Sequence, residues 1–323
     1  MRGIIRRTAF AVVAVLVASG SVRGAFTLTG VVRNEGGTGL SNVDLDFVDL
    51  CSGDNVFLVN DKTAADGSYS IVVNPGTYDI HFTPPVGSTV AGTETKEYTV
   101  AANANLGTTT LRPGFLVSGT ARNGSGTGIA GVDLKFVDAA TGDKAYFTKD
   151  TTTATGTYSV RVLPGTFELE FRPPATTTFA AKKRLNLVVA GNVSGLVDTL
   201  VTGFNAAGHV QTNSGNLAVK NVDLNFYDAC TGERIPTAND NTDAAGNYSI
   251  YVPSGTYSVL YSPPRCQPLV ADHQSGVSIT RDQNLGTTKL FPGDTISGRV
   301  LDDLGAPLPE AKVKLFASNN GQR

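Results

Sequence analysis

Apolar and polar residues alternate along most of the chain, in short runs bounded by Gly, Asn, Asp, Ser or Pro. In the segment 42–49, Val43, Leu45 and Phe47 alternate with polar residues. A period of two places apolar side chains on one face of a strand and polar side chains on the other. The pattern therefore predicts short β-strands that each bury one face.

The first ninety or so residues after the N-terminus contain several such strands. Apolar stripes at Tyr69, Ile71 and Val73 and from Tyr78 onward flank a turn at Pro75, which predicts a hairpin between these two strands. Seven short strands in this length are typical of an antiparallel sandwich. The predicted strands are 26–34, 42–50, 55–59, 68–73, 77–83, 94–101 and 106–111.

The same unit recurs along the chain. Gly30, Gly119, Gly208 and Gly298 follow one another at spacings of 89, 89 and 90 residues. The blocks NVDLDFVD, GVDLKFVD and NVDLNFYD keep this register, as do GTYDIHFTPP, GTFELEFRPP and GTYSVLYSPP. A fixed period over whole blocks indicates one structural unit used repeatedly. The stripes recur as Val132, Leu134, Phe136, Phe167, Leu169, Phe171, Val222, Leu224, Phe226, Tyr257, Val259 and Tyr261.

These observations predict an all-β protein of tandem seven-stranded antiparallel Greek-key β-sandwich domains. The predicted repeats are 25–114, 115–203 and 204–293. Residues 294–323 supply the first two strands of a fourth copy, and two strands are too few to bury a sandwich core. We expect this fragment either to continue beyond Arg323 or to pair with a sheet edge of another molecule.

The N-terminus has the pattern of a secretory signal peptide. Arg2, Arg6 and Arg7 precede an apolar run at 9–18, and small residues follow, with cleavage expected before Ala25. After that point no apolar run approaches the roughly 18 residues of a membrane span. Residues 1–24 therefore predict export to the cell surface or the extracellular space, with no membrane insertion once they are removed.

The charge balance argues against a polyanionic partner. The formal net charge is −2 and the isoelectric point is near 5.9, which provides no positive field for nucleic acid. The basic run at Lys182, Lys183 and Arg184 is interpreted as a solvated strand face.

Three cysteines are an odd number for an exported chain. Cys51 and Cys230 occupy the same slot in two repeats, where the other repeat has Ala140, and Cys266 occurs in the third repeat alone. Because Cys230 and Cys266 lie in one repeat, we predict a disulfide between them and a free thiol at Cys51.

Two stretches resemble the carboxypeptidase regulatory-like domain family. SGRVLDDLGAPLPEAKVKLF, from residue 297, has the family's Gly-x-Pro-Leu-Pro turn, and DGSY at 66–69 and PGTY at 75–78 match its middle strands. The resemblance implies a transthyretin-like (prealbumin-like) topology that overlaps with Cna B-type and carbohydrate-binding-like sandwiches. Such domains serve as stalks, as accessory domains beside enzymes or as sugar binders, so the resemblance implies architecture and not chemistry.

No catalytic, cofactor-binding or metal-binding residue is predicted. A zinc carboxypeptidase needs a His and a Glu three residues apart and a distant second His. His81, His209 and His273 have no Glu at that spacing, and His81 falls at an outward strand position. We interpret it as a surface histidine.

Two recurring turn positions have competing interpretations. Asp49, Asp138 and Asp228 could ligate calcium, but their loops lack the spacing of a compact oxygen cage, which favours a turn role. At 66–67 and the equivalent pairs of the other repeats only the Gly is constant. This pattern predicts a backbone with positive φ.

The sequence offers little support for sugar binding or for a covalent cross-link. The chain lacks Trp, the usual stacking platform for sugars, and Tyr146, Phe147 and Phe179 are either sugar-stacking candidates or core residues. The first strands FTLTGVVRN and FLVSGTARN contain no Lys, so a Lys to Asn cross-link of the Cna B-type is not expected.

The sequence thus favours a non-enzymatic secreted or surface protein whose repeats act as a structural or adhesive spacer for an unknown protein or glycan partner. The alternatives are an array of carbohydrate-binding accessory modules and the non-catalytic part of a longer secreted hydrolase.

Overall fold

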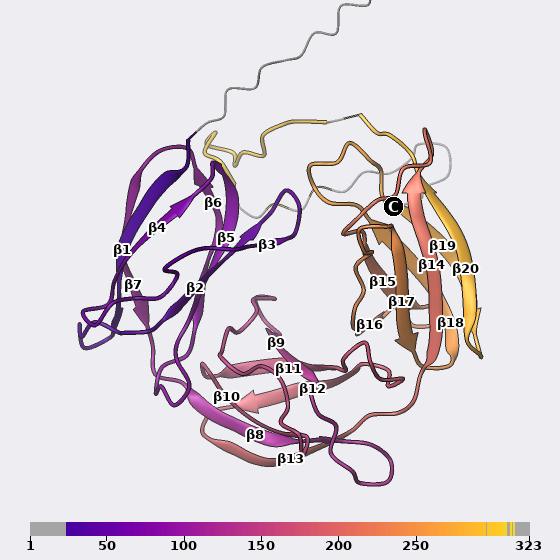
Figure 1. The fold of residues 1–323 in the computed structure, drawn as a ribbon, viewed down its shortest axis with the longest axis horizontal. Helices are drawn as coiled ribbons and strands as arrows, with labels where there is room; N and C mark the ends of the chain where they lie inside the picture. The colour runs from indigo at the N-terminus through magenta and orange to yellow at the C-terminus, as the bar shows by residue number, and fades with distance from the viewer. Residues whose placement is uncertain (1–23, 295, 309–310, 312, 314–323) are drawn as a thin grey trace, which may run out of the picture. The chain divides into compact units, whose positions relative to one another are not determined.

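The computed structural model describes residues 24–294, 296–308, 311 and 313, and its regular structure over these residues is entirely β-strand. The strands form six sheets, two in each of three consecutive segments (Figure 1). The predicted all-β sandwich architecture is confirmed. No helix capable of crossing a membrane occurs in the described residues. The predicted signal peptide lies outside them, apart from Gly24.

The first sandwich contains every strand predicted for it, with ends that differ by no more than three residues. One sheet has the order β4-β1-β7 and the other the order β3-β2-β5-β6. The strands are β1 (Phe26–Asn34), β2 (Asp44–Asp49), β3 (Asn55–Val56), β4 (Ser68–Val73), β5 (Gly76–Thr83), β6 (Thr93–Val100) and β7 (Ala104–Leu111).

The second sandwich pairs a sheet of order β10-β8-β13 with one of order β12-β11-β9. Its counterpart of β3 is reduced to an isolated bridge between Val137 and Lys144. Among the described residues this sandwich therefore has six strands, and the prediction of seven is wrong for it. The strands are β8 (Phe115–Arg122), β9 (Asp133–Asp138), β10 (Thr157–Val162), β11 (Gly165–Arg172), β12 (Lys182–Val189) and β13 (Val193–Thr199).

The third sandwich has seven strands again, in sheets of order β17-β14-β20 and β16-β15-β18-β19. They are β14 (Phe204–Thr212), β15 (Asp223–Asp228), β16 (Arg234–Ile235), β17 (Asn247–Val252), β18 (Gly255–Ser262), β19 (Asp272–Ile279) and β20 (Gln283–Leu290).

One strand pair in each sandwich is parallel. β1 runs parallel to β7, β8 to β13 and β14 to β20, whereas the other pairs are antiparallel. The prediction of wholly antiparallel sandwiches is wrong for these pairs. The chain reaches the last strand of each sandwich from the opposite sheet. No hairpin connects this strand to the first strand, so their pairing need not be antiparallel.

The predicted hairpin around Pro75 is also wrong, because β4 and β5 lie in opposite sheets. The chain crosses between the sheets at Asn74 and Pro75. Tyr78 fixes this crossing by donating a hydrogen bond from its hydroxyl to the Asn74 carbonyl oxygen at 3.0 Å. Tyr257 makes the equivalent bond to the Pro253 carbonyl oxygen at 2.7 Å. Alternation of apolar residues shows that both strands bury a face but not that they belong to different sheets.

Each sandwich has its own core between its two sheets. The predicted stripes supply most of it. Every predicted stripe residue is at most 5% exposed, including Phe47, Phe136 and Phe226, which are fully buried at equivalent positions. The prediction of the core is confirmed in all three repeats.

The glycine that marks the repeat lies under a tyrosine ring. Gly119 on β8 pairs with Tyr158 on β10, and a Cβ at Gly119 would lie 2.6 Å from both the Tyr158 hydroxyl oxygen and the Leu196 carbonyl oxygen. Gly30 with Tyr69 and Gly208 with Tyr248 repeat the arrangement. The ring occupies the space of a side chain, so only glycine fits.

The turn glycines behave as predicted. Gly67, Gly156 and Gly246 have φ of 83°, 76° and 78°. L-residues with a side chain rarely adopt this left-handed backbone, which accounts for a constant glycine beside a variable neighbour.

The chain divides into two compact units. One comprises residues through Asp49 together with Asn55–Pro113, and the other comprises Leu50–Asp54 together with the residues from Gly114 onward. The second and third sandwiches thus share a unit with a short loop from the first repeat. The boundaries predicted for the repeats stay predictions.

The start of the fourth repeat keeps its turn but not its first predicted strand. Leu301 bridges Pro307, and Asp302 accepts hydrogen bonds from the Leu304 and Ala306 amides at 3.0 and 2.8 Å. Residues 296–308 contain no regular strand, so the first predicted strand is not formed. Most of the second falls outside the described residues.

The buried tyrosine hydroxyls generate a test of the core. Tyr158 Oη is buried without a hydrogen-bond partner among the described residues, whereas Tyr248 Oη lies 3.2 Å from Tyr261 Oη. Tyr158→Phe should stabilise the chain by roughly 1 kcal/mol, because it removes an unsatisfied polar group. Tyr248→Phe should be neutral or destabilising by up to about 1.5 kcal/mol, because it breaks a bond. Calorimetric unfolding of both variants checks the difference, and shifts of the same sign would contradict it.

Candidate functional site: polar contacts outside the cores

The loop after the second strand has the same local design in the second and third sandwiches. The Asp228 carboxylate accepts hydrogen bonds from the Cys230 and Thr231 amides at 2.9 and 2.8 Å. Asp138 accepts the equivalent bonds from Ala140 and Thr141 at 2.8 and 3.0 Å. These bonds, that from the Thr231 amide first, lower the pKa of Asp228. The turn role predicted for these two aspartates is confirmed.

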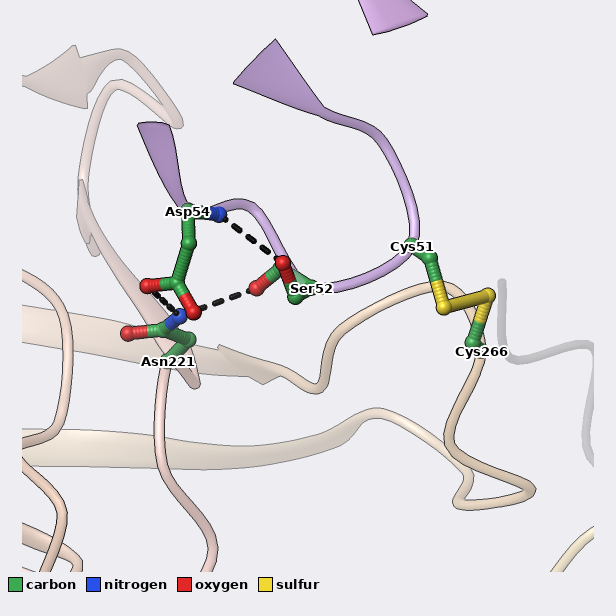
Figure 2. The surroundings of a disulfide bond; sticks show 5 residues. All are labelled: Cys51, Ser52, Asp54, Asn221 and Cys266. Atoms are coloured by element: carbon green, nitrogen blue, oxygen red, sulfur yellow. Dashed lines mark hydrogen bonds between the residues drawn. A yellow bond between two sulfur atoms is a disulfide. The ribbon is translucent and has the colours of Figure 1, made fainter. Parts of the chain in front are cut away.

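The structure pairs the cysteines differently from the prediction. Cys51 forms a disulfide with Cys266 across 215 residues, with the two Cα atoms 4.9 Å apart (Figure 2). Cys230 is exposed and its thiol is free. The predicted bond between Cys230 and Cys266 and the predicted free thiol at Cys51 are therefore wrong.

Strand direction explains the error. β15 and β18 are antiparallel, with Asp223 opposite Ser262 and Asp228 opposite Tyr257. Cys230 follows the end of β15 and Cys266 follows the end of β18, so they lie at opposite ends of this strand pair. At about 3.3 Å per residue their separation is roughly 20 Å. A disulfide allows no more than about 7 Å between Cα atoms.

Polar contacts seat the loop Leu50–Asp54 beside the disulfide. Asn221 Nδ2 donates to the Ser52 carbonyl oxygen at 2.9 Å and to Asp54 Oδ1 at 2.8 Å (Figure 2). Lys220 Nζ lies 2.9 Å from both carboxylate oxygens of Asp54. The hydrogen bond from Asn221, followed by that from Lys220, lowers the pKa of Asp54. The loop is thus held by an ion pair and hydrogen bonds as well as by the disulfide.

A second set of contacts joins the second sandwich to the third, and we call it the charged seam. Glu170 on β11 is 1% exposed, yet its carboxylate is ionically paired on both sides. Arg234 Nη1 lies 3.0 Å from Glu170 Oε1, and Lys135 Nζ lies 3.5 Å from Oε2. Burial lowers the pKa of Lys135, against the opposing effect of Glu170.

Arg172 makes the next contact of the charged seam. Its Nε donates to the Thr237 carbonyl oxygen at 2.6 Å and its Nη2 to Asp240 Oδ2 at 2.7 Å. The Thr237 hydroxyl donates to the same oxygen of Asp240 at 2.7 Å. Asp240 is 7% exposed and Thr237 is fully buried, so this contact is largely shielded from water.

The basic run of the second repeat is engaged in ion pairs. Lys183 pairs with Glu233 and donates to the Arg234 carbonyl oxygen at 3.1 Å, which adds to the charged seam. Lys182 and Arg184 pair with Asp198, which is 1% exposed, at 3.3 and 3.0 Å. The interpretation of this run as a solvated face is wrong.

The sequence carries one signal of the charged seam, in the residues at two outward strand positions. The slot of Glu170 holds His81 in the first repeat and Leu260 in the third, and the slot of Lys135 holds Asp46 and Asn225. The second repeat therefore concentrates charge at outward positions. Alignment shows this difference but cannot show that another sandwich covers these positions.

The other predicted candidates are not brought together. His81 lies on β5 of the first sandwich, whereas His209 and His273 lie on β14 and β19 of the third; the first two are partly exposed and His273 is exposed. In the part of the chain that the structure describes, no group of three or more His, Cys, Asp or Glu residues is placed to hold a metal ion.

Two of the three aromatic candidates belong to a core. Phe147 packs edge-on against Phe136, with ring centroids 5.5 Å apart, and Phe179 packs against the same core. Tyr146 is partly exposed. The core interpretation is confirmed for Phe147 and Phe179.

Comparison with known proteins gives weak similarities. No family model and no curated protein matches the chain. Among solved structures, the Bacillus anthracis TIE protein is 12% identical over 83% of this chain, with a TM-score of 0.25, and the match spans 51% of its own length. A Streptococcal ancillary pilin and the Bacillus cereus major pilin subunit BcpA are 11% and 10% identical over 83% of this chain and 99% and 100% of theirs, each with a TM-score of 0.24. Similarity this low transfers neither arrangement nor function, and the carboxypeptidase regulatory-like label stays a prediction.

The loop contacts predict how the disulfide responds to reduction. Asp54→Asn should make it about 2- to 5-fold easier to reduce with a phosphine, since an exposed charged contact contributes roughly 0.5–1 kcal/mol. Because the pKa of Asp54 is lowered in the folded chain, its contribution is present above the ordinary carboxyl pKa and is lost as the pH falls through the lowered value. Thiol labelling of Cys266 measures this. Asp143→Asn, at the equivalent position of the second sandwich, is the control, and an equal effect there would contradict the assignment.

The charged seam predicts a coupling between two sandwiches. Glu170→Gln should cost roughly 1–3 kcal/mol of stability, because it leaves Arg234 and Lys135 without their buried counter-charge. Hydrogen exchange should increase in β11 and also in β16, which carries Arg234. Leu260→Gln changes the equivalent position of the third sandwich and is the matched control. Increased exchange confined to the second sandwich would show that the two are not coupled through Glu170.

Proposed function

We propose that this chain is a non-enzymatic structural protein of the cell exterior, in which tandem sandwiches act as a spacer. The observation that carries the proposal is the use of polar side chains outside the cores. Glu170 with Arg234 and Arg172 with Asp240 join the second sandwich to the third. The disulfide of Cys51 adds a covalent tie. These groups hold parts of the chain together.

The comparison of repeats supports the same role. The core and turn positions are nearly identical in the three sandwiches, whereas the outward positions differ. Glu170 replaces His81 and Leu260 at a position that makes an inter-sandwich contact. Variation at outward positions thus alters how sandwiches connect, which is the property that a spacer needs.

The disulfide supports the proposed location. Structural disulfides persist in oxidising environments such as the bacterial periplasm and the cell exterior. Cys51 and Cys266 together with the signal-peptide pattern of residues 1–24 favour export. The partner that the spacer presents or binds is proposed to be a protein or glycan and not nucleic acid.

Localisation and activity assays test the proposal. Antibodies against the purified chain should label the outside of intact source cells or their medium, and the chain should hydrolyse neither peptides nor glycans. Retention in the cytoplasm, or turnover of any such substrate, would overturn it. The nucleotide sequence beyond the codon for Arg323 decides the alternative of a longer secreted hydrolase, which requires a catalytic domain encoded there.

One observation favours the carbohydrate-binding alternative. Phe57 is 94% exposed, and Tyr146 occupies the equivalent slot of the second repeat, although Pro236 occupies it in the third. Saturable retention on a polysaccharide that is lost in Phe57→Ala would establish this alternative. Leu217→Ala, which removes another exposed apolar side chain, is the control.

A further inference from the structure

The loop that carries Cys51 has a close counterpart in the third sandwich. Residues 51–54 read Cys-Ser-Gly-Asp and residues 230–233 read Cys-Thr-Gly-Glu. Gly53 and Gly232 have φ of 77° and 70°. In each loop the hydroxyl of the second residue accepts the amide of the fourth at 3.2 Å, from Ser52 and from Thr231. Sequence and backbone thus present both cysteines in the same way.

The structure shows what such a loop binds. The loop of Cys51 is seated on Cys266, Lys220 and Asn221, all of which belong to the third repeat. Beside the disulfide, the carboxylate of Asp54 is bound by the side-chain amide of Asn221 and the ammonium group of Lys220. We call Cys266, Lys220 and Asn221 the acceptor.

The loop of Cys230 cannot reach the acceptor of its own sandwich. The register of β15 with β18 places Cys230 and Cys266 at opposite ends, roughly 20 Å apart. Cys230 is exposed, and Glu233, at the position of Asp54, keeps half of its side-chain surface exposed beside Lys183. The same acceptor can therefore be offered to this loop only by another molecule.

We propose that Cys230 bonds to the acceptor of a second copy of this chain. The Cys230 thiolate attacks Sγ of Cys266 in the second copy, and the bond between Cys266 and Cys51 breaks. Cys51 leaves as a thiolate and takes up the proton that Cys230 released. One disulfide is broken and one is formed, so the exchange needs no oxidant or reductant.

The contact joins unlike surfaces, because the loop of Cys230 and the acceptor lie at opposite ends of the third sandwich. A head-to-tail contact of this kind leaves a free loop at one end and a free acceptor at the other. Repetition therefore produces an open series of covalently linked chains. The inference rests on the disulfide and the loops and not on the proposed surface role, and its test uses purified protein.

Electrophoresis without reductant tests the proposal. The purified full chain, with Cys51 bonded to Cys266, is incubated at high concentration near pH 8 without oxidant. A ladder of multimers should appear, should collapse to monomer on reduction, and should be absent from Cys230→Ser. Peptide mapping should find Cys230 linked to Cys266 and a new free thiol at Cys51.

Two controls keep the test specific. Ser214→Cys in the Cys230→Ser background offers an exposed thiol outside the loop, and it should form at least tenfold less multimer. Lys220→Ala with Asn221→Ala weakens the acceptor and should slow the ladder several-fold. Monomer alone, dimers linked through two Cys230 residues, a monomer without the bond of Cys51 to Cys266, or equal ladders from the Ser214→Cys control would each overturn the proposal.

Discussion

Burial of alternate side chains between two sheets is the interaction on which the rest of this structure depends. It fixes the strand positions in all three repeats. It also packs the tyrosine of β4, β10 or β17 against the first strand of the same sandwich. The contact of Tyr158 with Gly119 shows how tight this packing is, because even a methyl group at the glycine would meet a hydroxyl and a carbonyl oxygen. Burial also raises the pKa of Tyr69 to about 12, so the hydroxyls at this position stay neutral at physiological pH. Positions outside this constraint are the ones that vary between repeats.

Variation at one outward slot changes what a sandwich contacts. Glu170 is 1% exposed, and both Arg234 and Lys135 pair with its carboxylate. Buried ion pairs add little net stability over apolar packing, since the charges lose their hydration, but an unpaired buried charge is strongly unfavourable. The charged seam therefore penalises any placement of the two sandwiches that separates these partners. It acts on specificity of arrangement more than on stability.

The sequence allowed the core to be predicted residue by residue, since a period of two and a constant repeat are local signals. Phe47, Phe136 and Phe226 are examples. Strand direction and sheet membership were not predictable in the same way. The crossing at Pro75 and the separation of Cys230 from Cys266 depend on which strands pair, and pairing is a long-range property. The ionic partners of Lys183 were missed for the same reason, because one of them lies in another sandwich.

The disulfide between Cys51 and Cys266 has a mechanical consequence. Tension applied through residues on either side of this bond passes through the sulfur atoms, so the 215-residue separation between the cysteines carries none of it. A fully extended chain spans at most about 3.5 Å per residue, which makes the sequestered contour length roughly 750 Å. Reduction of this bond would place the intervening residues, which include the whole second sandwich, in the path of the force, and that length would be released only as they unfold.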